Sequence, residues 1–197
     1  MAIKPILFNT EMVRAILDGR KDATRRIVKG FIPDDAVWGY TAFTPKGYIS
    51  CRGTFADGYG EKFFKLPCEP GDILYVRETW KKAPNGYYYY EDWQRNDIAD
   101  VTKWKPSIHM PKEAARIWLK VTNVMVERLQ EITIDGIRNE GISSMAVHAG
   151  DMEIALKEWK NLWNSTIKKN RPDSYGWDAN PWVWVIEFER CEKPEGV

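Results

Sequence analysis

The feature that most constrains the fold is a long alternation of apolar and polar residues from Ala114 to Leu129. One face of this stretch carries Ala115, Ile117, Leu119 and Val121, and the other carries Arg116, Trp118, Lys120 and Thr122. A period of two residues is typical of a β-strand, and a strand of this length usually bends around a barrel. The alternation therefore predicts a bent sheet at the centre of the fold.

Other periodic segments predict the elements around this strand. Alternation predicts strands over residues 73–80 and 181–190, and a short strand over residues 5–9. Apolar residues at helical spacing predict helices over residues 11–18 and 151–166, the second on the barrel surface. Strands and helices in this order indicate the α+β class.

The length of the chain indicates one domain with insertions. At 197 residues it is long for one small domain and short for two. Residues 30–68 are rich in Gly and Pro, which predicts hairpins and loops. Residues 81–111 are rich in aromatic and turn residues, which predicts a hairpin and a loop. We expect both segments to be elaborations of one domain that spans residues 1–197.

A basic turn, residues 19–26, follows the first predicted helix, which Thr10 is placed to cap and Gly19 to end. Residues 14–29 hold six cations and two acids, whereas the whole chain has a net charge of +1. Attraction to an anion must therefore come from a local patch. Guanidinium groups bind phosphate with two parallel hydrogen bonds, so the turn predicts three phosphate-binding residues. These are Arg20, Arg25 and Arg26.

The sequence gives little support to metal, cofactor or membrane function. Cys51, Cys68 and Cys191 are widely spaced and form no C-x-x-C pair, so neither a disulfide framework nor a zinc site is indicated. His109 and His148 belong to no metal-binding motif. No long apolar run and no signal-peptide pattern is present. We expect a soluble, cytoplasmic protein without metal or cofactor.

The basic turn and a later strand together resemble a known signature. Gly19-x-Lys21-x-x-Thr24-x-Arg26 is followed by Pro70-Gly71-Asp72 and a strand that carries Glu78. This pattern is similar to that of the ASCH domain family, in the PUA-like superfamily. The match is strong over residues 5–29 and 69–80 and absent from the two insertions. It implies a small bent β-barrel flanked by helices, with a cleft where the basic turn faces the barrel mouth.

The resemblance also implies a class of ligand and a chemistry. The family is associated with binding of RNA or nucleosides. Some bacterial members are amidohydrolases that deacylate N4-acetylcytidine, and others are linked to RNA cleavage. The matching active centre would be Lys21, Thr24 and Glu78. The chain looks most similar to longer ASCH-like proteins of phages and prophages, for which no single substrate is implied and the location is the bacterial host cytoplasm.

Two interpretations of Lys21, Thr24 and Glu78 stay open. Glu78 shares a predicted strand face with Leu74 and Val76, and a buried carboxylate needs a partner. If Lys21 is that partner and the basic turn is helical, Lys21 and Thr24 converge. Thr24 then attacks an amide carbonyl, or Lys21 or Glu78 activates water. Alternatively, Glu78 forms a structural salt bridge with an arginine of the turn, Arg25 or Arg26.

A second group of cleft residues consists of rings near the second insertion. The group is His109, Trp80, Tyr88 and Trp93. Exposed aromatic rings stack bases in proteins that bind single strands, although a run of tyrosines is more often strand surface. Two partner hypotheses follow. One is RNA, single-stranded nucleic acid or a modified nucleoside in the cleft, and the other is a host protein bound without catalysis through the aromatic insertion.

Overall fold

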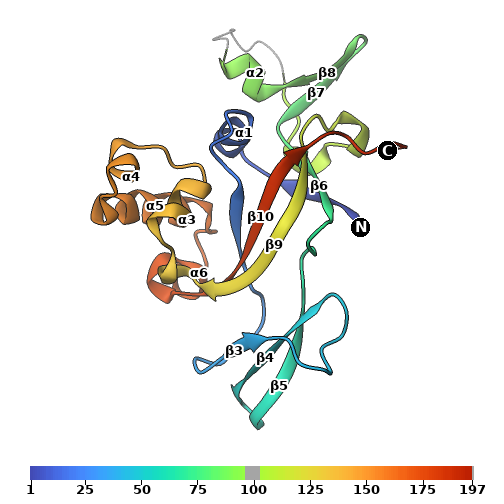
Figure 1. Cartoon of the computed structure of the whole chain (residues 1–197). Coiled ribbons are helices and arrows are strands. Elements are labelled where there is room, and N and C mark those ends of the chain that lie inside the picture. Colours follow the sequence, from blue (N-terminus) through green and yellow to red (C-terminus); the bar gives the residue numbers. More distant parts are fainter. Residues whose placement is uncertain (96–102, 197) are drawn as a thin grey trace.

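The strands of the computed structural model, which describes residues 1–95 and 103–196, form three separate sheets (Figure 1). The main sheet has five strands in the order β1-β6-β9-β10-β2. Their bounds are Ile3–Leu7 for β1, Ile73–Arg77 for β6, Trp118–Arg128 for β9, Trp182–Cys191 for β10 and Ala23–Ile27 for β2. β1 pairs with β6 in parallel, and the other neighbours are antiparallel. The predicted α+β class is confirmed.

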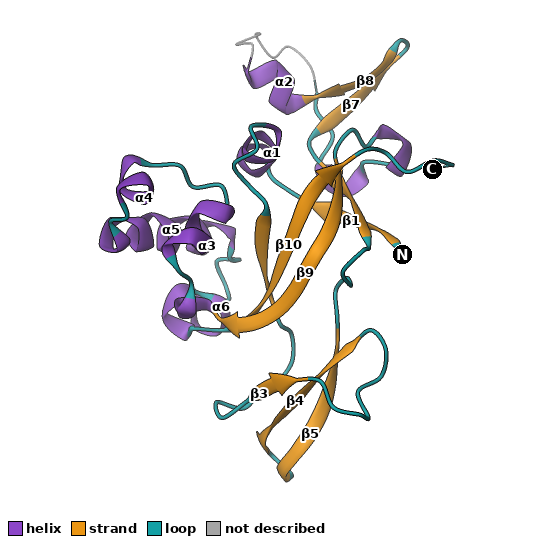
Figure 2. Ribbon diagram, viewed as in Figure 1, coloured by secondary structure: helices purple, strands orange, loops and turns teal. Residues whose placement is uncertain are grey.

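The long strands β9 and β10 carry the predicted bend, which Figure 2 shows as two arcs side by side. Their register shifts between Glu187 and Phe188, and such an irregularity increases local twist and curvature. The described strands do not close a barrel by pairing, because β1 and β2 remain as the two edges of the sheet. A side chain joins these edges instead: Arg26 Nη2 donates to the Leu7 carbonyl at 2.9 Å.

Helix α1 (Thr10–Leu17) connects β1 to β2 and begins one residue earlier than predicted. Its cap is Asn9, whose side chain accepts a hydrogen bond from the Met12 amide at 2.9 Å, and not Thr10. Gly19 has a φ of 70°, which confirms the left-handed stop. Val13 and Ile16 are buried in the main core, so α1 covers the sheet, and the basic turn leads from α1 into β2.

A helical layer packs against the part of the sheet formed by β10 and β2 (Figure 1). It consists of α3 (Ile134–Asn139), α4 (Met145–Ala149), α5 (Met152–Thr166) and α6 (Pro172–Tyr175). Helix α5 matches the predicted helix, and the Asp151 side chain caps it. Trp159 and Trp163 of α5 pack in one buried cluster with Val183 of β10. The helix therefore lies on the sheet surface, as predicted.

Residues 30–68 form a three-stranded antiparallel sheet, here called the meander. It consists of β3 (Val37–Gly39), β4 (Tyr48–Phe55) and β5 (Gly58–Lys65). Trp38 anchors it to β10 through edge contacts, with ring centroids 5.7 Å from Trp182 and 6.2 Å from Trp184. The hairpins predicted for this insertion are present, and aromatic packing fixes them to the main sheet.

The segment of residues 81–111 also contains the predicted hairpin. Strands β7 (Trp80–Ala83) and β8 (Gly86–Tyr89) pair with each other and lead into a short helix, α2 (Tyr90–Arg95), that the sequence did not predict. Residues 96–102 of the predicted loop lie outside the described residues. The strand predicted to reach Trp80 divides at Glu78 and Thr79, where β6 has ended and β7 has not begun.

Candidate functional site

Lys21 lies in a buried ionic network that joins the basic turn to the end of α3. Its Nζ donates to Glu140 Oε2 at 2.6 Å, to the Glu140 carbonyl at 3.0 Å and to the Ala23 carbonyl at 2.7 Å. An ammonium has three N–H donors, so all of them are used inside the protein. The side chain has no exposed surface. Burial lowers the pKa of Lys21, and the Glu140 charge opposes this shift.

Two of the predicted phosphate-binding arginines are also held by groups of the protein. Arg25 Nη1 lies 3.3 Å from Glu140 Oε1, and Arg25 Nε donates to Glu127 Oε1 at 2.7 Å. Only 4% of the Arg25 side chain is exposed. Arg20 donates to the Gly141 carbonyl at 2.6 Å and pairs with Asp18 at 3.1 Å. The basic turn is therefore largely neutralised from within.

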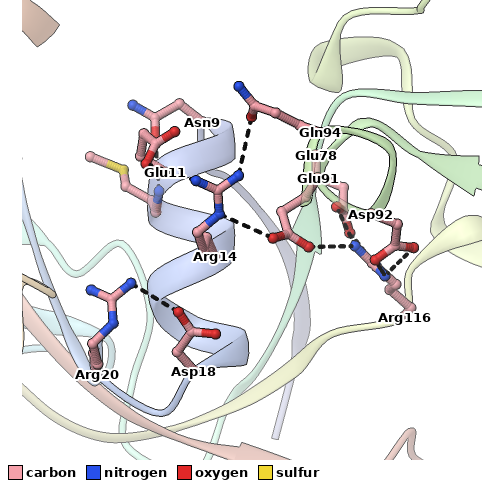
Figure 3. A network of polar contacts seen from close by, with 11 residues as sticks. Asn9, Glu11, Arg14, Asp18, Arg20, Glu78, Glu91, Asp92, Gln94 and Arg116 are labelled. Carbon is pink, nitrogen blue, oxygen red and sulfur yellow. Dashed lines mark hydrogen bonds and ion pairs between the residues drawn. The ribbon is translucent and has the colours of Figure 1, made fainter. Parts of the chain in front are cut away.

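Glu78 belongs to a different network, shown in Figure 3. Arg116 donates to both Glu78 oxygens at 2.9 Å and pairs with Asp92 at 2.7 Å. Arg14 of α1 reaches Glu91 of α2 at 3.3 Å. Burial raises the pKa of Glu78, and the hydrogen bonds from Arg116 oppose that shift. The carboxylate is buried as predicted, with only 2% of the residue exposed.

These partners correct the expected contact. The predicted pairing of Lys21 with Glu78 is wrong, because Glu140 pairs with Lys21 and Arg116 pairs with Glu78. The alternative salt bridge from Glu78 to an arginine of the basic turn is wrong for the same reason. A guanidinium with two parallel bonds to one carboxylate is a strong and specific pair. Each charged group is thus held in its own network.

Thr24 is placed differently from the expectation as well. The residues after Lys21 enter strand β2 and not a helical turn, so a spacing of three no longer puts Lys21 and Thr24 on one side. Thr24 lies opposite Ile186 of β10 and is 1% exposed. The void that it lines has a volume of about 20 Å³, which holds no more than a water molecule.

A larger hollow, here called the edge cleft, opens between the edge strands β1 and β2. Its volume is about 340 Å³, within the range of small-molecule sites. It is lined by Lys4, Pro5, Ile6, Leu7, Arg26, Pro67, Cys68, Leu74 and Ile186. The walls are mainly apolar, and no carboxylate is among these described lining residues. The structure thus places one residue of the predicted site, Arg26, on a cavity large enough for a nucleoside.

The two cations of the edge cleft, Arg26 and Lys4, are held in place by few protein groups. Arg26 stacks over Phe8 at 5.3 Å and donates one hydrogen bond to the Leu7 carbonyl. Burial lowers the pKa of Arg26, although arginine stays charged near neutral pH. Lys4 pairs with Asp72 at 3.0 Å. The cleft therefore presents positive charge beside an apolar floor.

Cys68 is the one thiol that borders the edge cleft in the described chain. It is 1% exposed, and burial raises its pKa to about 11. A thiol with so high a pKa is protonated near neutral pH and is a poor nucleophile. Cys68 is thus part of the wall.

The second group of predicted cleft residues lies away from the edge cleft, and none of its four members is in the described lining. His109 is exposed at the end of the 3₁₀ turn Ser107–His109. Trp80 is buried and packs against Tyr87 at 5.7 Å. Tyr88 and Trp93 lie 5.7 and 5.1 Å from the Lys81 ammonium. Tyr88 and Trp93 therefore pack against each other and around Lys81.

The sequence reasoning missed several residues of these sites. Glu140 lies 119 positions from Lys21, and Arg116 lies 38 positions from Glu78, so no local pattern links either pair. The sequence next to Lys4 does indicate its position at a sheet edge. Pro5 follows Lys4 within a strand, and proline in a strand marks a sheet edge. An edge strand has unpaired backbone groups along one side.

Within residues 1–95 and 103–196, no three His, Cys, Asp or Glu side chains are grouped so that they would hold a metal ion. In the same residues, no helix has the length and apolar character needed to span a bilayer.

No family model matches the chain, and no curated protein does. Among solved structures, the chain is similar to the hypothetical protein PH0355, with 14% identity and a TM-score of 0.41, over 97% of this chain and 100% of that one. It is also similar to an ASCH domain from Lactobacillus crispatus JV V101, with 11% identity and a TM-score of 0.40, over 96% of this chain and 79% of that one. Likenesses at this level assign neither a family nor an activity.

Proposed function

We propose that the chain is an ASCH-like module that binds a nucleoside unit, either a free modified nucleoside or one unit of RNA or another single strand, in the edge cleft. The observation that supports this most directly is the cleft itself. It combines a volume of about 340 Å³, apolar walls and two cations without a lining carboxylate. The motif resemblance over residues 5–29 and 69–80 favours the same class of ligand.

The lining suggests how a nucleoside would be held. Pro5, Leu74 and Ile186 supply apolar surface against a base, and Arg26 and Lys4 supply donors and charge for ribose or phosphate oxygens. Arginine has five N–H donors, and in the described chain Arg26 uses one of them, toward Leu7. Its remaining donors are the principal polar contacts that we assign to the ligand.

The proposal is for binding and not for hydrolysis. A Lys–Thr–Glu centre requires Lys21 and Glu78 to share one site, and their pairs with Glu140 and Arg116 keep them in separate networks. We expect N4-acetylcytidine and short RNAs to be recovered intact after incubation with the protein, as measured by liquid chromatography. Turnover that disappears in the Lys21→Ala variant, while the variant stays folded, would contradict this.

Calorimetric titration tests the binding proposal. We expect cytidine or N4-acetylcytidine to bind the wild type, and the Arg26→Ala variant to bind roughly ten- to one-hundredfold more weakly, since a hydrogen bond to a charged group contributes about 1.5–3 kcal/mol. Arg138→Ala is the matched control, because Arg138 is exposed on α3 and pairs locally with Asp135. Equal affinity of the Arg26 and Arg138 variants would refute the proposal.

A second function is favoured by the exposed rings of the meander. Phe31, Phe43 and Tyr59 are 68%, 83% and 74% exposed. Exposed apolar side chains mark protein interaction surfaces where they gather into a patch. The exposed rings therefore favour residues 30–68 over residues 81–111 as the surface that binds a partner protein. This second function predicts that a stoichiometric protein partner is retained by Arg26→Ala and lost by Phe43→Ser, with pull-down as the measurement.

A further inference from the structure

Two more hollows continue the edge cleft along the surface. The second has a volume of about 320 Å³ and shares Arg26 and Pro67 with the edge cleft. The third has a volume of about 440 Å³ and shares Ile27 and Lys29 with the second. Shared walls make the second hollow a neighbour of both the edge cleft and the third hollow, and residues of β2 border all three.

We propose that the three hollows form one track for a single-stranded nucleic acid several nucleotides long, here called the basic track. The inference rests on the proposed function, because the edge cleft is its first hollow. Its own content is that the natural ligand is a polymer, and that the second and third hollows receive the nucleotides next to the one in the edge cleft.

The charge of the lining is the first argument. Six cations border the three hollows: Lys4, Arg26, Lys29, Lys65, Lys168 and Arg171. No Asp or Glu is among their described lining residues, in a chain that has 28 acids and a net charge of only +1. A positive path on a protein whose net charge is only +1 is complementary to a phosphate backbone.

The availability of these cations is the second argument. Lys29, Lys65, Lys168 and Arg171 are exposed, and in the described part of the chain none of them forms an ion pair. They contrast with the basic turn, whose charges are used internally. The path has a defined end, because the hollow beyond it is lined by Asp173 and Asp178 as well as by lysines. The positive lining therefore covers a limited length of strand.

Aromatic side chains are the third argument. The half-buried ring of Phe64 lines the second hollow, and the half-buried ring of Tyr175 lines the third. Arg171 lies over the Tyr175 ring at 5.8 Å. Proteins that bind single strands without strict sequence preference combine such rings with a basic groove, because every base has a face that stacks. A duplex hides those faces, which is why we assign a single strand.

The meander gains a role in this arrangement, since Phe64 and Lys65 come from β5. Trp38 holds this wall in place, because its ring contacts Phe64 at 5.1 Å and also contacts Trp182 and Trp184 of β10. The second hollow is thus built between β2 of the main sheet and an inserted strand. The insertion extends the binding surface from one nucleotide to several.

Fluorescence anisotropy with a labelled single-stranded RNA of twelve nucleotides, and the DNA of equal sequence, tests the track. The track variants are Lys29→Ala with Lys65→Ala, and Lys168→Ala with Arg171→Ala. The control variant is Lys112→Ala with Lys120→Ala, two exposed lysines that line none of the three hollows. We expect each track pair to weaken oligonucleotide binding roughly tenfold and to reduce the slope of log K against log salt by about 1.4, that is about 0.7 per cation. The control should match the wild type.

Cytidine binding separates this inference from the proposed function. We expect cytidine to bind the track variants as it binds the wild type, because their residues lie outside the edge cleft. If the oligonucleotide binds no tighter than cytidine, or if the track variants behave like the control, the track is overturned while the nucleoside site stands. If neither ligand binds, both are overturned. Tighter binding of an acidic peptide than of RNA also overturns the track.

Discussion

The cations of the basic turn and those of the basic track are alike in chemistry and opposite in placement. Lys21 and Arg25 are buried against Glu140, whereas Lys29 and Lys65 are exposed beside a hollow without a lining acid. Arg26 stands between the two groups, because it borders both the small void beside Glu140 and the edge cleft. A cluster of basic residues in a sequence is therefore not one functional unit, since burial and strand geometry divide it.

The largest effect that tests this division is on stability. Glu140→Ala leaves Lys21 and Arg25 buried without their shared carboxylate, and breaking a buried ion pair typically costs about 3–5 kcal/mol. We expect urea unfolding to show that loss. Glu192→Ala, which removes an exposed glutamate after β10, is the control and should change the free energy of unfolding very little. Equal stability of the two variants would show that the buried network is not structural.

A smaller effect is expected where the meander joins the sheet. Trp38→Ala removes a half-buried ring that contacts Phe64, Trp182 and Trp184, and we expect a loss of about 2–3 kcal/mol, somewhat below the cost for a fully buried tryptophan. Amide hydrogen exchange should quicken in β3–β5. Oligonucleotide binding should weaken while cytidine binding is kept. Unchanged exchange in the meander would mean that other contacts hold it.

The smallest effect concerns the pH dependence of the second buried network. Burial raises the folded-state pKa of Glu78 above its ordinary value of 4.5, so above that pH the folded state holds the proton more firmly than the unfolded state. The contribution of protonated Glu78 to the stability of the folded state is fully present below pH 4.5, and it is lost as the pH rises through the folded-state pKa. Relative to Glu78→Gln, the wild type should lose free energy of unfolding over this interval. A rise in the free energy of unfolding over the same interval would instead mean that the hydrogen bonds from Arg116 outweigh the effect of burial.

Local periodicity accounts for the parts of the fold that were predicted. The alternation in β9 and β10 and the apolar spacing in α5 each span ten or more residues, so their period is clear. The short helices α3, α4 and α6 have no such pattern and were missed. The open edges of the sheet were missed too, because strand pairing depends on distant segments.

The candidate site was less predictable, and the reason is physical. The type and position of Glu78 were enough to predict its burial, since it shares a strand face with apolar residues. Its partner Arg116 and the Lys21 partner Glu140 depend on tertiary contacts across 38 and 119 positions. Lys168 and Arg171 reach the basic track from the end of the helical layer, which no motif near the basic turn indicates.

We propose that ligand binding belongs to the edge cleft and the exposed cations beside it, and not to Lys21 and Glu78. A titration of isotope-labelled protein with cytidine, followed by amide NMR shifts, tests it most directly. We expect the largest shifts at Lys4, Ile6, Leu7, Arg26 and Cys68, which line the cleft and carry an amide proton, and very small shifts at Glu78 and Arg116. Shifts centred on Lys21, Glu78 and Arg116 would contradict the account.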